Sequence, residues 1–264
     1  MKLLSAFCLI ATYCFANSAK AGDFYIGYEY LIWNAEIGFD LDANSDGLIN
    51  VGEFFDYEPE SEFHVISFDY EHRFDTLSFL LNFKKSIDDS DLEGFYTANG
   101  IKIFNEVDDS GDYKRFGIGL GYRPFPSARG GIELIYVDVD FDNPDGGKPS
   151  AKVEDIGINL YQDYWLSHKK YTVGLLFGTT ITKTEFESSL LDVSQDLESI
   201  SLALYVEPYI GYDITPDLSL VFKVGYFYQA DITDEVASSD AGPSDFGQLE
   251  QSFANFELGL SYKF

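Results

Sequence analysis

Oxygen-bearing side chains recur at short spacing in one early segment of the chain. The positions are Asp42, Asn44, Asp46, Asn50 and Glu53, with Gly47 between the two groups. Alternate residues on a tight loop can converge on one point, and a hard cation such as Ca²⁺ takes about six to eight oxygen ligands. This segment therefore predicts a cation site.

The residues from Asp42 to Phe54 are similar to the calcium loop of the EF-hand family. The resemblance implies ligands at Asp42, Asn44, Asp46, the Leu48 carbonyl, Asn50 and Glu53, with a dissociation constant on the order of 10⁻⁴–10⁻³ M. Gly47 and Ile49 match the turn glycine and the apolar position of that family. The surroundings differ, because a strand pattern precedes the segment and Pro59 limits any following helix to about a turn or two. A chance match within an acidic loop is the alternative.

Three histidines are the remaining candidates for chemistry. His72 and His168 fall near predicted periplasmic strand ends, whereas His64 falls near an external end among acidic residues. A barrel protease or lipid hydrolase could use such a base, but the favoured interpretation is a rim histidine that contacts water or lipid headgroups. Because the sequence has no Ser-His-Asp set, nucleophile elbow or zinc spacing, we expect no enzymatic activity.

The N-terminus has the pattern of an export signal. Met1-Lys2 precedes an apolar run from Leu3 to Phe15, which is too short for a spanning helix. Ala19-Lys20-Ala21 fits a cleavage site, so residues 1–21 are predicted to be a cleaved signal peptide, with a retained anchor helix as the alternative. Both cysteines lie inside that segment, so the exported chain is expected to form no disulfide.

The composition is acidic and aromatic. The net charge is −28, and it becomes −30 when Lys2 and Lys20 leave with the signal peptide. Nucleic acid is excluded as a partner because phosphate contacts need Lys and Arg. Aromatic residues make up 17% of the chain, whereas disordered acidic chains are poor in them.

Alternating residues predict strands along the rest of the chain. In the last segment Phe256, Leu258, Leu260, Tyr262 and Phe264 alternate with polar or small residues, as in a strand with lipid outside and a polar lumen inside. Similar patterns predict strands around 24–32, 66–73, 77–83, 116–122, 132–136, 156–164, 171–181, 200–210 and 218–228. We therefore expect residues 22–264 to form an all-β, transmembrane, antiparallel up-and-down β-barrel of about ten strands, within a range of roughly 8–12.

The connections alternate between short and long. Those near 74–76, 124–130, 167–170 and 213–217 are short, as periplasmic turns are. External loops are predicted at 36–61, 85–112, 142–152, 184–197 and 231–249. Two features fit less well, because Pro208 lies inside a predicted strand and residues 96–107 have strand character inside a predicted loop.

The export signal, the terminal run and the aromatic strands together resemble Gram-negative outer-membrane barrels of the porin-like kind. Tyr30-Leu31-Ile32-Trp33 also looks like the start of some major-outer-membrane-type pore proteins. The resemblance implies the cell outer membrane as location and lipid and lipopolysaccharide as partners. It names no functional site.

The predicted inward positions carry both charges: Glu29, Asp69, Glu71, Arg73, Arg115, Arg123, Asp163, Glu207, Lys223 and Glu257. They could pair and fill the lumen, or they could line a narrow pore whose acidic mouth favours small cationic solutes. Three functions follow. A small porin-like channel with a calcium-binding loop is favoured, a structural or adhesive surface barrel is the alternative, and a barrel enzyme using His64 is third.

Overall fold

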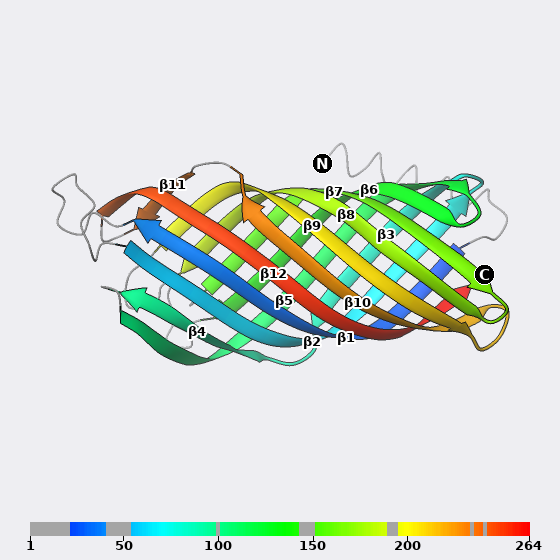
Figure 1. Ribbon diagram of the computed structural model, residues 1–264, viewed down its shortest axis with the longest axis horizontal. Helices are drawn as coiled ribbons and strands as arrows, with labels where there is room; N and C mark the ends of the chain where they lie inside the picture. The colour runs from blue at the N-terminus through cyan, green and yellow to red at the C-terminus, as the bar shows by residue number, and fades with distance from the viewer. Residues whose placement is uncertain are drawn as a thin grey trace.

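The computed structural model describes residues 22–40, 54–98, 101–142, 151–188, 195–232, 235–239 and 242–264. These residues form strands and short connections wound around one axis (Figure 1). The strands are β1 (Gly22–Asp40), β2 (Phe54–Phe74), β3 (Leu77–Ser86), β4 (Ser90–Ala98), β5 (Ile101–Phe125), β6 (Ala128–Asp142), β7 (Ala151–His168), β8 (Tyr171–Ser188), β9 (Gln195–Asp213), β10 (Leu218–Asp231), β11 (Glu235–Ser239) and β12 (Gly242–Lys263). No described helix is long and apolar enough to cross a membrane.

The sheet closes on itself. Neighbours follow the order β1-β12-β10-β9-β8-β7-β6-β5-β3-β2, and β2 pairs again with β1. Strand β4 continues β3, because both pair with β2 on one side and β5 on the other. Strand β11 continues β10 between β9 and β12 in the same way. Within the described residues this is a closed antiparallel barrel of ten strand positions, so the predicted fold class and strand count are confirmed.

The two chain-terminal strands form the closing seam. Strands β1 and β12 pair from Asp23↔Lys263 to Phe39↔Gly247 without a shift in register. The backbones of Gly22 and Phe264 exchange two hydrogen bonds of 3.0 Å at the end of this ladder. Closure leaves no unpaired edge there, which is the condition for a sheet to cross a bilayer.

The predicted short connections are tight turns at one end of the barrel. Asp75 and Lys169 have φ values of 61° and 56°, as two-residue hairpin turns with the twist of the flanking strands require. Phe74 pairs with Leu77 and His168 with Tyr171 directly across these turns. The C-terminus lies at the same end (Figure 1).

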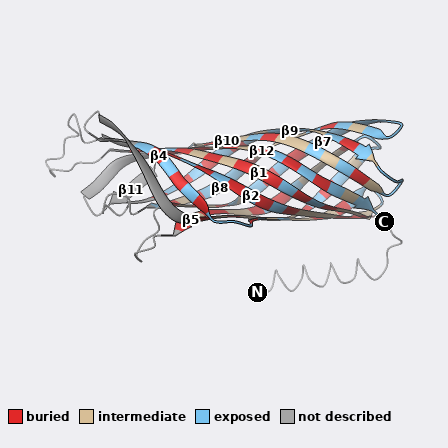
Figure 2. Ribbon diagram, turned by 90° about the horizontal axis from the view of Figure 1, so that it is seen from below, coloured by how far each residue is buried: buried red, intermediate tan, exposed pale blue. Residues whose placement is uncertain are grey.

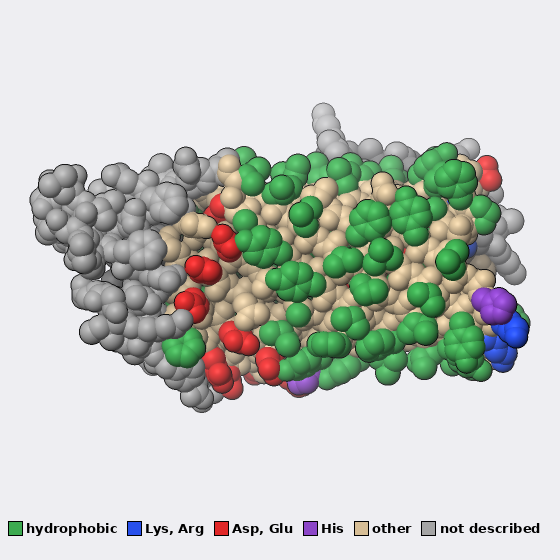
Figure 3. Space-filling view, viewed as in Figure 1, with side chains coloured by type: hydrophobic (Ala, Val, Ile, Leu, Met, Phe, Trp, Pro, Cys, Tyr) green, Lys and Arg blue, Asp and Glu red, His purple; other side chains and the backbone are tan. Residues whose placement is uncertain are grey.

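Side chains alternate between the wall's two faces along every strand, visible as bands of buried and exposed residues (Figure 2). The outward face carries a wide apolar belt around the turn half and the middle of the barrel, followed by acidic side chains toward the other end (Figure 3). Exposed belt residues include Ile26, Leu120, Leu134, Ile158, Leu204 and Leu258. Such a belt matches the hydrocarbon layer of a membrane.

The predicted long loops include residues that form strands in the structure. Strand β1 runs to Asp40 and β2 begins at Phe54, so the loop predicted at 36–61 has strand at both ends. Residues predicted as loop at 85–112, 142–152, 184–197 and 231–249 likewise include parts of β3 to β12. Beyond the membrane the outer face of each strand meets water. The pattern of apolar outward residues that marks the turn half of the strands therefore does not continue there.

The two irregular segments are also accounted for. Residues 96–107 lie in the hairpin of β4 and β5, which ends at Ala98↔Ile101 and extends the barrel wall. Pro208 lies inside β9 and pairs with Leu175 of β8. The β9–β10 ladder skips two residue pairs between Lys223↔Tyr209 and Tyr226↔Val206, and Pro208 lies in this gap.

Candidate functional site

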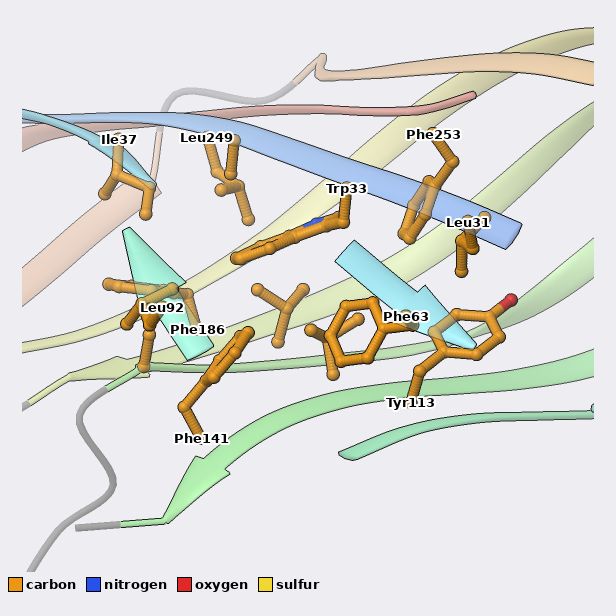
Figure 4. Close-up of a cluster of buried hydrophobic side chains, with 14 of the residues drawn as sticks. Leu31, Trp33, Ile37, Phe63, Leu92, Tyr113, Phe141, Phe186, Leu249 and Phe253 are labelled. Carbon is orange, nitrogen blue, oxygen red and sulfur yellow. The ribbon is translucent and has the colours of Figure 1, made fainter. Parts of the chain in front are cut away.

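The lumen is the candidate site, and an apolar cluster fills its half farthest from the turns. Trp33, Phe63 and Phe141 have relative exposures of 0% and come from three different strands. Trp33 stacks on Phe141 with ring centroids 5.6 Å apart, and Phe63 lies 5.8 Å from the same ring. The cluster also contains Leu31, Ile37, Tyr57, Val65, Leu92, Tyr113, Val139, Val153, Phe186, Leu197, Leu249 and Phe253 (Figure 4).

This cluster spans the barrel interior from one wall to the other. Its members come from β1, β2, β4, β5, β6, β7, β8, β9 and β12, and they point toward one another in the close-up (Figure 4). Each buried member is at most 8% exposed, as expected of side chains in a packed protein interior. We call this group, as defined above, the lumenal plug.

A hydrogen-bonded polar layer borders the plug. Asp155 accepts hydrogen bonds from Gln229 at 2.9 Å and from Gln251 at 2.8 Å, and a further one from Thr184. Gln251 in turn accepts a 3.1 Å hydrogen bond from the indole of Trp33. The layer thereby satisfies buried polar groups directly beside an apolar cluster.

Buried ion pairs occupy the middle of the lumen. The Lys84 ammonium lies 2.7 Å from Glu29 and 4.0 Å from Glu257. Lys223 lies 3.1 Å from Glu257 and 3.7 Å from Asp69. Glu29 and Glu257 are at most 1% exposed. Loss of their lysine partners would leave buried, unpaired carboxylates and destabilise the fold.

A polar cavity of about 460 Å³ occupies the turn half of the lumen. Arg129 bridges Glu71 at 2.8 Å and Asp163 at 2.9 Å. Arg73 pairs with Asp23 and lies 3.6 Å from Glu71. The lining reaches residues next to the short turns, so the cavity opens toward that end.

Glycines on the inner wall make room for large side chains. A Cβ on Gly131 would lie 2.5 Å from the ring of Tyr161, and one on Gly174 would overlap Tyr209. Gly117 and Gly119 likewise face the side chains of Asn82 and Glu133.

Protein-family models and curated proteins give no match to this chain. Among solved structures it is similar to the outer membrane protease OmpT from Escherichia coli, with a TM-score of 0.60 and 11% identity over 94% of this chain and 99% of that one. The fold is that of an outer-membrane β-barrel. Pseudomonas aeruginosa OprG (TM-score 0.42, 15% identity, 94% and 98% of the two chains) and Neisserial surface protein A (0.35, 13%, 91% and 97%) also match.

The inward positions of this outer-membrane barrel agree with the sequence prediction. Each of the ten charged residues predicted to face the lumen lies on the inner wall, where it forms an ion pair or lines a cavity. Sequence analysis missed Lys84, Arg129 and Asp155 as lumen residues. Lys84 lies one residue beyond the strand predicted at 77–83, and Arg129 lies in the connection predicted at 124–130. Extending the alternation past the predicted strand ends would have placed both on the inner wall.

The three histidines lie on the outer wall or at a turn. His64 hydrogen-bonds to Tyr28 and stacks on its ring at 5.8 Å, on the outward face of β2. His72 lies beside Phe74, and His168 precedes the turn at Lys169. His72 and His168 therefore lie at the turn end of the barrel, and none of the three histidines faces the lumen.

The predicted calcium ligands Asp42, Asn44, Asp46, Leu48, Asn50 and Glu53 lie outside the described residues. The strands on both sides of this segment are described. The last residue before it, Asp40, pairs with the first residue after it, Phe54. In the rest of the described chain, no group of three or more His, Cys, Asp or Glu side chains is arranged to hold a metal ion.

Proposed function

We propose that this protein is an outer-membrane barrel with a closed lumen that acts at the cell surface through its external rim and loops. The lumenal plug is the observation that carries the proposal. Water and ions cross a pore only along a path wide enough for them, and an apolar constriction blocks that path by dewetting. The structural or adhesive role foreseen as the alternative thus becomes the first candidate.

A small channel is the second candidate, and the polar cavity supports it. That cavity extends from the turn end to Lys84, and a smaller void of about 80 Å³ continues from Lys84 to Phe253 at the plug. Conduction of small cations would require the plug to open. We therefore expect the channel to be closed unless the plug moves.

Solute uptake by proteoliposomes separates these two candidates. Vesicles that contain the refolded protein are diluted into an iso-osmotic solution of a small sugar, and swelling is followed by light scattering. We expect no swelling above that of empty vesicles. Swelling at the rate given by a general porin, included as a positive control, would instead favour the channel.

The outer membrane is the proposed location, with lipid and lipopolysaccharide as partners. The apolar belt and the similarity in fold to outer-membrane barrels support this placement. The short turns then face the periplasm, and the opposite end of the barrel faces outward.

We also keep the prediction that the protein is not an enzyme. The OmpT structure named above is that of a protease, but the likeness reaches only the fold. In this barrel His64 points outward and contacts Tyr28 and Tyr30, so it has no lumenal partner for catalysis. Hydrolysis of peptide or phospholipid that is lost in His64→Ala would contradict this prediction.

Calcium binding by residues 42–53 remains part of the proposal. The flanking residues Asp40 and Phe54 pair with each other on the two sides of this segment. We expect calorimetry to show Ca²⁺ binding with a dissociation constant on the order of 10⁻⁴–10⁻³ M. Glu53→Gln should abolish the heat.

A matched control uses an acidic side chain on the same external half but outside the segment. Glu60 faces outward on β2 and is exposed, so Glu60→Gln should leave the calcium heat unchanged. Equal losses in Glu60→Gln and Glu53→Gln would show that the heat comes from general acidity. The calcium proposal would then be abandoned.

A further inference from the structure

All four arginines of this acidic chain line one cavity. Arg73, Arg115, Arg123 and Arg129 are its only arginines, and each contributes to the lining of the polar cavity in the turn half of the lumen. Three lysines line it as well, so 7 of the 17 basic residues gather there. Seven acidic residues line the same cavity and balance this charge in number: Asp23, Asp69, Glu71, Glu133, Asp163, Glu207 and Asp213.

The arginines differ in how far their donors are used. Arg129 donates hydrogen bonds to Glu71 and Asp163. Arg123 lies over the ring of Trp165, with its guanidinium carbon 5.0 Å from the centroid, and its one ion contact is at 3.6 Å from Glu71. Within the described chain, Arg123 makes no side-chain hydrogen bond. Its donors therefore remain available to a ligand.

The contact with Trp165 holds the Arg123 guanidinium over an aromatic ring. A planar guanidinium fork can hold two oxygens of one anion. Arg73 and Arg129 meet Arg123 at the Glu71 carboxylate, which all three approach within 3.6 Å. Three guanidinium groups thus gather around the Glu71 carboxylate.

Access to this point is from one side. The cavity lining includes Asp213 and Lys263, which lie next to the short connections at the turn end. The lumenal plug closes the opposite end. A volume of about 460 Å³ lies within the range of small-molecule sites.

We propose that this cavity binds a small soluble oxyanion, a phosphate or carboxylate group, which enters from the turn end and is held by Arg123 with Arg73 and Arg129 beside it. The seven acidic residues of the lining match its seven basic residues in number, so the site selects geometry more than charge. Chloride, which cannot accept two parallel hydrogen bonds on separate atoms, is bound more weakly.

The two tryptophans provide the readout, because Trp33 lies in the plug and Trp165 lies under Arg123. In a Trp33→Phe background, the fluorescence comes from Trp165 alone. Titration with inorganic phosphate in phosphatidylcholine vesicles should give a saturable change that sodium chloride of equal ionic strength does not. Arg123→Gln should weaken the apparent affinity about ten- to a hundredfold, because charge-assisted hydrogen bonds are lost.

Calorimetry on the otherwise unchanged protein gives a second readout, since Arg123→Gln alters the surroundings of Trp165 even without ligand. Lys114→Gln is the matched control, because Lys114 faces outward and pairs with Asp112 at 2.8 Å. Phosphate heat that is lost in Arg123→Gln and kept in Lys114→Gln supports the site. No saturable response to phosphate or acetate, or one that Arg123→Gln leaves unchanged, would overturn it.

A parallel arm replaces soluble phosphate with vesicles that contain phosphatidylglycerol. The phosphate chemistry is the same, but the source is then a lipid headgroup. A response only in this arm would contradict a soluble ligand.

Discussion

At the residue scale, the lumen depends on charges that are buried only in pairs. Lys84 neutralises Glu29 and Glu257, and its removal would leave both carboxylates without this ammonium in the barrel middle. We expect Lys84→Met to lower the free energy of unfolding by about 3–5 kcal/mol, the usual effect of breaking a buried ion pair. Urea titration in lipid vesicles measures it.

Two further variants distinguish pairing from general loss of charge. Adding Glu29→Gln to Lys84→Met should recover part of the stability, because one unpaired carboxylate is removed. Lys183→Met breaks an exposed pair with Glu185 and should leave the urea midpoint unchanged. A midpoint shift in Lys183→Met as large as that in Lys84→Met would refute the buried-pair explanation.

Individual inward positions could be predicted from the sequence, but their partners could not. Alternation places Glu29 and Lys223 on the inner wall because a strand has a period of two. Their partners come from strands far along the chain, as in the Asn255–Glu29 hydrogen bond of 2.7 Å, so only the register of the closed barrel brings them together.

At the element scale, the polarity of the two wall faces reverses between the two halves of the barrel. The apolar side chains face outward in the turn half and inward in the other half. In the turn half of β1, Ile26 and Tyr28 face outward, whereas in the other half Trp33 and Ile37 face inward and Glu36 faces outward. Patterns that look for apolar outer faces therefore find the membrane part of each strand and miss its continuation. This is why the predicted loops extended into β1 and β2.

The closing seam depends on a glycine in β12. A Cβ on Gly259 would lie 2.5 Å from the carbonyl oxygen of Ile26 and from the ring of Tyr25. We expect Gly259→Ala to reduce the fraction of protein that folds, measured by the shift in gel mobility between unheated and heated samples. Strand β1 must otherwise move away from β12.

The control for this substitution is Gly211→Ala in β9. A Cβ there would meet nothing closer than 3.7 Å, so the folded fraction should stay at the wild-type level. If both alanine variants fold equally well, the seam tolerates the added methyl group and our explanation of Gly259 is incorrect.

At the scale of the whole molecule, the sequence predicted the barrel, its strand number and the end at which the turns lie. It left open whether the lumen is packed or conducting, because both need polar inward residues. The proposal of a packed lumen rests on Trp33, Phe63 and Phe141, which lie on β1, β2 and β6 and meet only when the sheet closes. Ile135, Val137 and Val139 add apolar side chains to the inner wall of β6.

Conductance across a planar lipid bilayer tests the closed lumen most directly. We predict no channel steps from the wild-type protein, and steps from a Trp33→Ala, Phe141→Ala variant in which part of the plug is removed. Steps from the variant also prove that the barrel inserts in the bilayer. Regular steps from the wild-type protein, at a conductance similar to that of the variant, would contradict the closed lumen and restore the channel.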